Sequence, residues 1–199
     1  MPVPPMNSIP ASDMIVVIMP TPPKSLDLST LTVRDATEPD LPMIVDIYNQ
    51  SIPGGWSTAD TTPVTVVDRV EWFRKFTPAK RPIWVAEHNG TIVAWVSLSS
   101  FYAGRPAYDA TAEVSVYVAT AYHKQGLGRW LKQRMIDACP RLGVTTLLSM
   151  YFDHNTGTKH INDQMGFVTM GHLNEIATVQ GQKRGLIIAG LRIPPDAPR

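Results

Sequence analysis

Residues 116 to 131 read VYVATAYHKQGLGRWL, a β-branched run followed by a polar turn with two glycines and then an apolar pattern. The run has the composition of a strand, and Leu127, Leu131 and Met135 recur behind it at helical spacing. A strand that enters a helix through glycines leaves backbone N–H groups unpaired at the positive end of the helix dipole. The stretch therefore predicts either a phosphate-binding turn or a tight turn whose glycines serve packing alone.

The glycine spacing does not fit two common nucleotide-binding patterns. The P-loop pattern GxxxxGK[ST] is absent at this turn, and Leu131 stands where the dinucleotide fingerprint GxGxxG needs its third glycine. A phosphate-binding turn here therefore belongs to another class of ligand site.

Composition limits the classes of function. The chain has 199 residues, of which 44% are hydrophobic and 18% charged, so it can bury one core and is expected to form one main domain. A net charge of +1 without long charged blocks argues against nucleic acid and membrane surfaces as partners and favours a small molecule. Cys139 is the single cysteine and the five histidines lack zinc-site spacing, so we expect no disulfide, no metal and a cytoplasmic location.

The first thirty residues differ from the rest of the chain. Seven of the eighteen prolines lie there, around an apolar run MIVVIM at 14 to 19 that is too short for a membrane span. We expect residues 1–30 to be an extended arm, either disordered or with residues 14–19 docked as an edge strand. The folded domain is expected over 31–193, with a tail at 194–199.

Hydrophobic periodicity and breakers place the elements of this domain. Thr37 and Thr65 are expected to cap helices, 51–63 has too many breakers for regular structure, and Asn89-Gly90 suits a tight hairpin. The predicted order is strand 31–36, helix to about 50, helix 66–76, strands 83–87, 91–98 and 112–118, helix to 139, strand 144–152, helix to about 165, and strands 167–173 and 186–192. This pattern indicates an α/β fold.

The strand at 112–118, AEVSVYV, separates two sets of side chains. Because side chains alternate along a strand, the apolar Ala112, Val114, Val116 and Val118 share one face. The opposite face then carries the three residues Glu113, Ser115 and Tyr117.

The turn HKQGLG at 123–128 resembles the sequence [QR]xxGx[GA] of the GNAT N-acetyltransferases. Further stretches, VRDATEPDLPMIVDIYNQSI, PVTVVDRVEWF, RPIWVAEHNGTIVAWVSL and RPAYDATAEVSVYV, extend the resemblance over nearly all of 31–193 and narrow it to the phosphinothricin acetyltransferase-like subgroup. The resemblance implies the GNAT fold, a central mixed sheet of about seven strands flanked by about four helices.

The resemblance also implies a site for acetyl-CoA. The pyrophosphate would bind at the glycine turn, where His123 replaces the usual Gln or Arg, and Asn155 would contact the cofactor or be an ordinary turn residue. The pantetheine arm would bond to the main chain of a strand that separates from its neighbour. The cofactor-binding residues implied are Val116, Tyr117, Val118, His123, Lys124, Gln125, Gly126, Leu127, Gly128, Arg129 and Asn155.

The family's strand-borne glutamate corresponds to Glu113, which the resemblance implies is the base that takes the proton of the attacking amine. On position alone Glu113 would be a solvated strand-end residue. Many relatives have a tyrosine or histidine five residues before Phe167 that protonates the leaving thiolate, but this chain has Asn162, which cannot give up a proton. Water, the acidity of CoA or another group must then complete the reaction; His160 is expected to point elsewhere.

The acceptor side carries weaker signals. Asp60 could pair with an ammonium group and Arg105 with a carboxylate, with Tyr108 nearby and Ser115 lining the pocket, although Asp60 and Arg105 are equally read as surface ions or turn caps. The expected function is acetyl transfer from acetyl-CoA to the primary amine of a small amino-acid-like acceptor, by direct attack in a ternary complex. The alternatives are a protein or peptide N-acetyltransferase and a CoA-binding module with little turnover. The apolar strands near the C-terminus and the N-terminal arm both offer edges to pair, so a homodimer is a further expectation.

Overall fold

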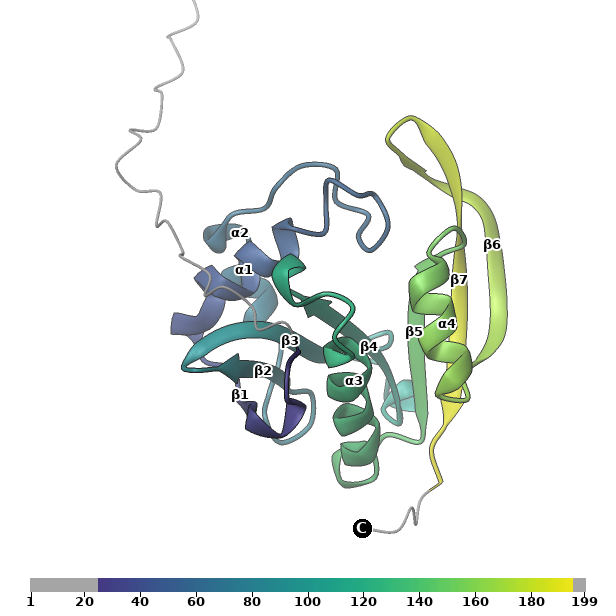
Figure 1. The fold of residues 1–199 in the computed structure, drawn as a ribbon. Helices are drawn as coiled ribbons and strands as arrows, with labels where there is room; N and C mark the ends of the chain where they lie inside the picture. The colour runs from purple at the N-terminus through teal and green to yellow at the C-terminus, as the bar shows by residue number, and fades with distance from the viewer. Residues whose placement is uncertain (1–24, 195–199) are drawn as a thin grey trace, which may run out of the picture.

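The computed structural model describes residues 25–194 and folds them around a seven-stranded sheet (Figure 1). The strands are β1 Thr32–Asp35, β2 Ile83–His88, β3 Thr91–Ser100, β4 Thr111–Val118, β5 Thr146–Phe152, β6 Val168–Val179 and β7 Gln182–Arg192. The α-helices of the described residues are α1 Leu41–Asn49, α2 Val66–Phe73, α3 Leu127–Ala138 and α4 Thr156–Gln164. The expected mixed sheet with four flanking helices is confirmed.

The sheet has one parallel junction, and it lies in the middle. The strand order is β1-β2-β3-β4-β5-β7-β6, and every neighbouring pair is antiparallel except β4 with β5. The parallel pairing runs from Thr111↔Thr146 to Glu113↔Leu148 and then stops. Beyond that point β4 and β5 separate, so the second half of β4 has an edge without a strand partner. In Figure 1 the two halves of the sheet diverge at this place.

The helices cover opposite faces of the sheet. The indole N–H of Trp95 donates to the carbonyl of Ile44 at 3.1 Å, which places α1 on the face that carries Trp95 and, by register, Tyr117. On the other face, α3 approaches Val118, whose Cγ2 lies 3.5 Å from the position of a Cβ built on Gly128. α4 lies against β5 on the right of Figure 1. The alternation along β4 therefore directs one face towards α1 and α2 and the other towards α3.

Local sequence signals explain the element ends. Thr65 and Asp68 form a reciprocal capping box at the start of α2, as expected, and Thr37 with Asp40 forms another just before α1. The hairpin between β2 and β3 turns at Asn89 and Gly90, both with positive φ. Leu26, which precedes the expected start of the domain at 31, is buried in the core. The apolar run at 14–19 lies outside the described residues.

The closing hairpin differs from the expectation. Strands near 167–173 and 186–192 were expected, whereas β6 and β7 continue to a tight turn at Gln180-Gly181. β6 is an edge strand with exposed apolar side chains, so dimerisation through this edge stays a prediction. The exposed apolar side chains of β6 are Val168, Met170, Leu173 and Ile176. Within residues 25–194, no helix is long and apolar enough to cross a membrane.

Candidate active site

A cavity of about 1020 Å³ fills the space where β4 and β5 separate. Its walls come from the second half of β4, the glycine turn, the first turns of α3, β5, the start of α4 and the loop at 50–57. A cavity of this size is at the upper end of the range for small-molecule and cofactor sites. The separation of two central strands thus creates a cavity large enough for a cofactor.

The glycine turn presents free backbone donors to this cavity. Gly126 is the N-cap of α3 with φ of 80°, and no side chain caps the helix. The first intrahelical bond runs from the N–H of Trp130 to the carbonyl of Gly126 at 3.0 Å, which leaves the preceding N–H groups of the turn without helical partners. A side chain at Gly126 would be strained because its φ lies in the left-handed region. The turn has the features of an anion site.

The expected cofactor residues gather around this cavity with one exception. Gln125 does not line it, and its Oε1 is buried without a hydrogen-bond partner among the described residues. The expected residues that do line the cavity are Val116, Tyr117, Val118, His123, Lys124, Gly126, Leu127, Gly128, Arg129 and Asn155.

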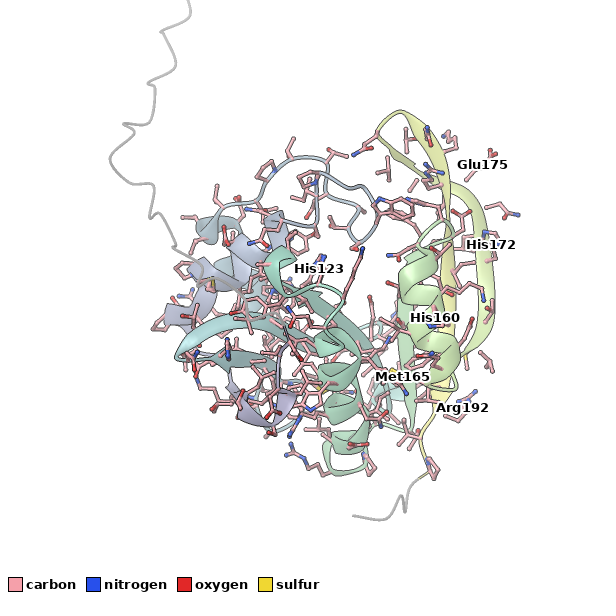
Figure 2. The ribbon with its side chains drawn as sticks, in the orientation of Figure 1. His123, His160, Met165, His172, Glu175 and Arg192 are labelled. Carbon is pink, nitrogen blue, oxygen red and sulfur yellow. The ribbon has the colours of Figure 1, made fainter. Side chains whose placement is uncertain are left out.

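His123 has an internal hydrogen bond. Its Nε2 lies 2.9 Å from the carbonyl of Val118, so Nε2 carries the proton and donates it to the end of β4. Neutral His123 therefore has no second N–H for a phosphate, and it fixes the turn to the strand. Figure 2 labels His123 before α3 and His160 on α4; both border the cavity.

Asn155 also has internal partners. Its Oδ1 accepts from the N–H of Thr158 at 2.9 Å, which caps α4, and its Nδ2 donates to the carbonyl of Trp56 at 2.8 Å. The side chain thus ties the loop at 50–57 to α4 and holds one wall of the cavity in place.

A second cavity of about 220 Å³ lies on the opposite face of β4. Glu113 lines this smaller cavity, while Ser115 and Tyr117 line both cavities. Tyr117 is stacked on Trp95 with ring centroids 4.6 Å apart, which fixes this wall. The two cavities therefore meet at β4, with Glu113 on the side of the smaller one.

The surroundings of Glu113 favour a neutral carboxyl group more than water does. Burial raises the pKa of Glu113 above its ordinary value. A carboxylate with a raised pKa is a stronger base at neutral pH than an exposed one, provided that it is still largely ionised. Glu113 can thus accept a proton from a molecule in the smaller cavity.

The smaller cavity contains a cation that the sequence reading did not single out. Arg69 of α2 lines it, pairs with Asp60 at 2.9 Å through Nη2, and lies over the ring of Tyr48 at 4.5 Å. Arg69 and Trp72 of α2 line the cavity together with Phe76, which follows the end of this helix.

The four residues predicted to bind the acceptor differ in whether they line a cavity. Ser115 lines both cavities. Asp60 lines neither, but its carboxylate accepts from the Tyr48 hydroxyl at 2.5 Å and holds Arg69. Arg105 and Tyr108 are exposed in the turn between β3 and β4, where Arg105 lies 5.5 Å from the Tyr102 ring centroid, and neither lines a cavity. The structure therefore does not bring Arg105 and Tyr108 to either cavity.

The two polar residues of α4 diverge, as a separation of two positions requires. His160 is exposed at the border of the large cavity and lies 3.0 Å from the side-chain nitrogen of Gln164. Asn162 is buried and bonds to Lys132 and Ser149 instead. His160 therefore points elsewhere than Asn162, as expected, and it borders the large cavity.

Comparison with known proteins identifies the family. The model of the Acetyltransferase (GNAT) family matches residues 41–167, which contain the glycine turn and Glu113. The chain belongs to this family. It is therefore an acetyl-transferring enzyme, and the resemblance expected from its motifs is confirmed.

Among the GNAT relatives, one from Bacillus subtilis (strain 168) is called "Putative phosphinothricin acetyltransferase YwnH"; it is 42% identical and the match covers 80% of this chain and 98% of that protein. The L-amino acid N-acyltransferase MnaT of Escherichia coli (strain K12) is 28% identical, and the match covers 84% of this chain and 99% of that protein. A crystal structure described as a "putative phosphinothricin N-acetyltransferase" has a TM-score of 0.80 at 41% identity, and the match covers 82% of this chain and 99% of that chain. These similarities support the phosphinothricin acetyltransferase-like subgroup of the family.

Proposed function

We propose that this GNAT enzyme transfers the acetyl group of acetyl-CoA to the primary amine of a small amino-acid-like acceptor, in a ternary complex. The observation that carries the proposal is the meeting of two cavities at β4, one beside the glycine turn and one containing Glu113. Two substrates bound on opposite sides of the same strand can react directly, without an acetylated enzyme.

The large cavity fits the cofactor's chemistry. The free N–H groups at the start of α3 suit the pyrophosphate, and the absence of a Cβ at Gly126 and Gly128 allows its close approach. The edge of β4 from Val114 to Val118 has no strand partner on the β5 side, so its backbone is free to bond to the pantetheine amides. An N–H on this edge would also hold the thioester oxygen as negative charge develops there.

In the smaller cavity, Glu113 takes the proton that the amine loses during attack on the thioester carbonyl carbon. Because burial raises the pKa of Glu113, its carboxylate is a stronger base than that of an exposed glutamate. Its place on β4 puts it one register position before the strand begins to separate from β5.

The size and charge of the smaller cavity support a small acidic or zwitterionic acceptor. A volume of about 220 Å³ has room for a single small molecule and not for a folded peptide segment. Arg69 at the wall offers a guanidinium to a carboxylate, while Trp72 and Trp95 supply apolar walls. The names of the relatives, among them an L-amino acid N-acyltransferase, support the same class of acceptor.

The test is release of free CoA thiol from acetyl-CoA with a panel of amines. The panel contains the proteinogenic amino acids, phosphinothricin, methionine sulfoximine, polyamines and a lysine-containing peptide. We expect saturable thiol release with one or more of the amino-acid-like amines. Release only with the peptide would identify a peptide acetyltransferase, and CoA binding without release from any amine would identify a binding module; either result contradicts the proposal.

A further inference from the structure

We propose that the ammonium group of Lys132 is the acid that protonates the leaving CoA thiolate. The inference rests on the proposed transfer from acetyl-CoA and assigns the proton that Asn162 cannot supply. Lys132 lies on α3, is 5% exposed, and lines the large cavity.

Three contacts hold the amine of Lys132 between α3, α4 and β5. Nζ donates to the hydroxyl of Ser149 at 3.0 Å and to Oδ1 of Asn162 at 2.5 Å, and it lies 4.5 Å from the ring centroid of Phe167. Asn162 also donates from Nδ2 to the Ser149 hydroxyl at 3.2 Å. Both partners are acceptors for the amine, so these contacts orient Nζ while one of its three protons stays free.

The place of this cluster in the sheet links it to the thioester. Leu148 is the last residue of β5 that pairs with β4, opposite Glu113, and Ser149 follows it directly. Ser149 is therefore the first residue of β5 past the point where the strands separate, and it lines the large cavity. Lys132 and Glu113 thus stand near the same point of the sheet, Lys132 beside β5 on the large-cavity side and Glu113 on β4 beside the smaller cavity.

In the proposed reaction, Glu113 acts as the base and Lys132 as the acid. The amine nitrogen forms a bond to the carbonyl carbon and its proton passes to Glu113, while the carbon–sulfur bond breaks and sulfur leaves with the electron pair. The thiolate takes a proton from the Lys132 ammonium to become the CoA thiol. Lys132 then regains a proton from water and Glu113 returns its proton to water, so the enzyme ends unchanged.

The protonation state of Lys132 suits this role. Burial lowers the pKa of Lys132 to about 7, so its ammonium is a stronger acid than an exposed lysine and is still substantially present at neutral pH. Burial is the cause of the shifts at both Lys132 and Glu113, with no contribution from one to the other. The ionisable groups on the elements packed against Lys132 are Arg129, Arg134 and Asp137 on α3, Glu113 and Tyr117 on β4, Tyr151 on β5, and Lys159, His160 and Asp163 on α4.

The test compares Lys132→Met and Lys132→Arg with the wild type in kcat, its pH dependence and CoA affinity. Methionine keeps the length of the side chain without the charge, and arginine keeps the charge but does not give up a proton near neutral pH. We expect both variants to lower kcat by about 10²- to 10³-fold. We also expect both to lose the decline of kcat that the wild type shows as pH rises above about 7, with less than roughly threefold change in the dissociation constant of CoA.

The matched control is Lys159→Met, which removes an exposed lysine of α4 that pairs with Asp163 and lines neither cavity. It should keep the kcat and the alkaline decline of the wild type. Lys132→Leu replaces the Met variant if that protein does not fold, as judged by circular dichroism.

Two outcomes overturn the inference in distinguishable ways. If the wild type releases thiol and the folded Lys132 variants keep its kcat and its alkaline decline, Lys132 is a structural lysine and the proposed function stands. If the wild type releases no thiol with any amine, the proposed function and this inference fail together.

Discussion

At the scale of single residues, Glu113, the proposed base, lines the smaller cavity and is buried enough to shift its pKa upwards. We expect Glu113→Gln to lower kcat by about 10²- to 10⁴-fold, because the amide cannot accept the proton of the amine. A base works when deprotonated, so wild-type kcat should fall as pH drops through the raised pKa. The variant should lack this acidic decline. Assays of CoA thiol release between pH 5 and 9 measure both the lower kcat and the loss of its acidic decline.

Glu71→Gln is the matched control for Glu113, because Glu71 lies on the exposed face of α2 and lines neither cavity. It should leave kcat and its pH profile unchanged. Calorimetry should give similar dissociation constants for CoA in all three proteins. An unimpaired Glu113→Gln enzyme would remove this residue from the mechanism.

Arg69 allows a test of acceptor recognition that is separate from chemistry. If its guanidinium binds the acceptor's carboxylate, Arg69→Met should raise KM for an amino acid by about 10- to 100-fold, the size of one lost charge-assisted hydrogen bond. The KM of the matching amine without a carboxylate should change much less. The control is Arg74→Met, because Arg74 is an exposed arginine at the C-terminal end of α2 that pairs with Glu71 and lines neither cavity. Equal KM changes for both acceptors would show that Arg69 only supports the cavity wall.

Sequence reasoning reached Glu113 but not Arg69 or Lys132, and the difference is physical. Alternation along β4 is a local property, so the face of Glu113 follows from the sequence alone. Arg69 reaches the cavity through a long side chain held by Asp60, and Lys132 meets Ser149 and Asn162 from three separate elements. Such meetings depend on tertiary packing, which no local pattern contains.

At the scale of elements, the glycine turn before α3 makes the clearest prediction. Gly126→Val should raise the dissociation constant of CoA by at least about tenfold, because a branched side chain strains the left-handed backbone and covers the N–H groups. Gly143 has φ of 70°, no atom within 4 Å of an added Cβ, and lies beyond the far end of α3. Gly143→Val therefore carries similar backbone strain without touching the cavity.

Calorimetric titration with CoA separates the two glycine variants. Both should lose stability by a similar amount, and only Gly126→Val should lose affinity. Equal CoA binding by the two proteins would mean that the phosphates bind elsewhere.

Elements with strong local signals were predicted well, and those with mixed patterns were not. The Thr65 capping box and the Asn89-Gly90 turn fix their elements through neighbouring residues. The distal half of the β6–β7 hairpin is largely exposed, so it lacks the alternation of buried and polar residues that marks a strand. The early end of the β4–β5 pairing, which creates the large cavity, has no local signature at all.

At the scale of the whole molecule, strand β4 separates the two cavities in which the proposed function places the two substrates. β4 pairs with β3 along its full length, which holds it rigidly, while its other edge is released after Glu113. The released edge faces the large cavity, the side chain of Glu113 lines the smaller one, and Ser115 lines both. One strand can therefore hold the donor by its backbone and the acceptor by its side chains.

The burial of Lys132 should lower the free energy of unfolding, and the size of this effect should depend on pH. The pKa of Lys132 is about 7 when folded and 10.5 in the unfolded reference, so between these values the unfolded chain binds more protons. The free energy of unfolding then rises with pH through that window, by at most roughly 5 kcal/mol. Lys132→Met has no such proton, so its stability advantage should be largest below pH 7 and shrink towards pH 10.

Urea unfolding of the wild type and Lys132→Met at pH 6, 8 and 10 measures this difference directly. Lys132→Met also loses the hydrogen bonds to Ser149 and Asn162, which changes its free energy of unfolding by an amount that does not depend on pH. Burial also raises the pKa of Tyr122 and Tyr151, which lowers the free energy of unfolding at high pH. Both proteins contain these tyrosines, so their contribution cancels when the free energy of unfolding of one protein is subtracted from that of the other. If the difference in free energy of unfolding between the wild type and Lys132→Met stays constant from pH 6 to 10, Lys132 keeps its ordinary pKa in the folded protein. The free energy of unfolding depends on the titration of a group only when the pKa of that group differs between the folded and unfolded states.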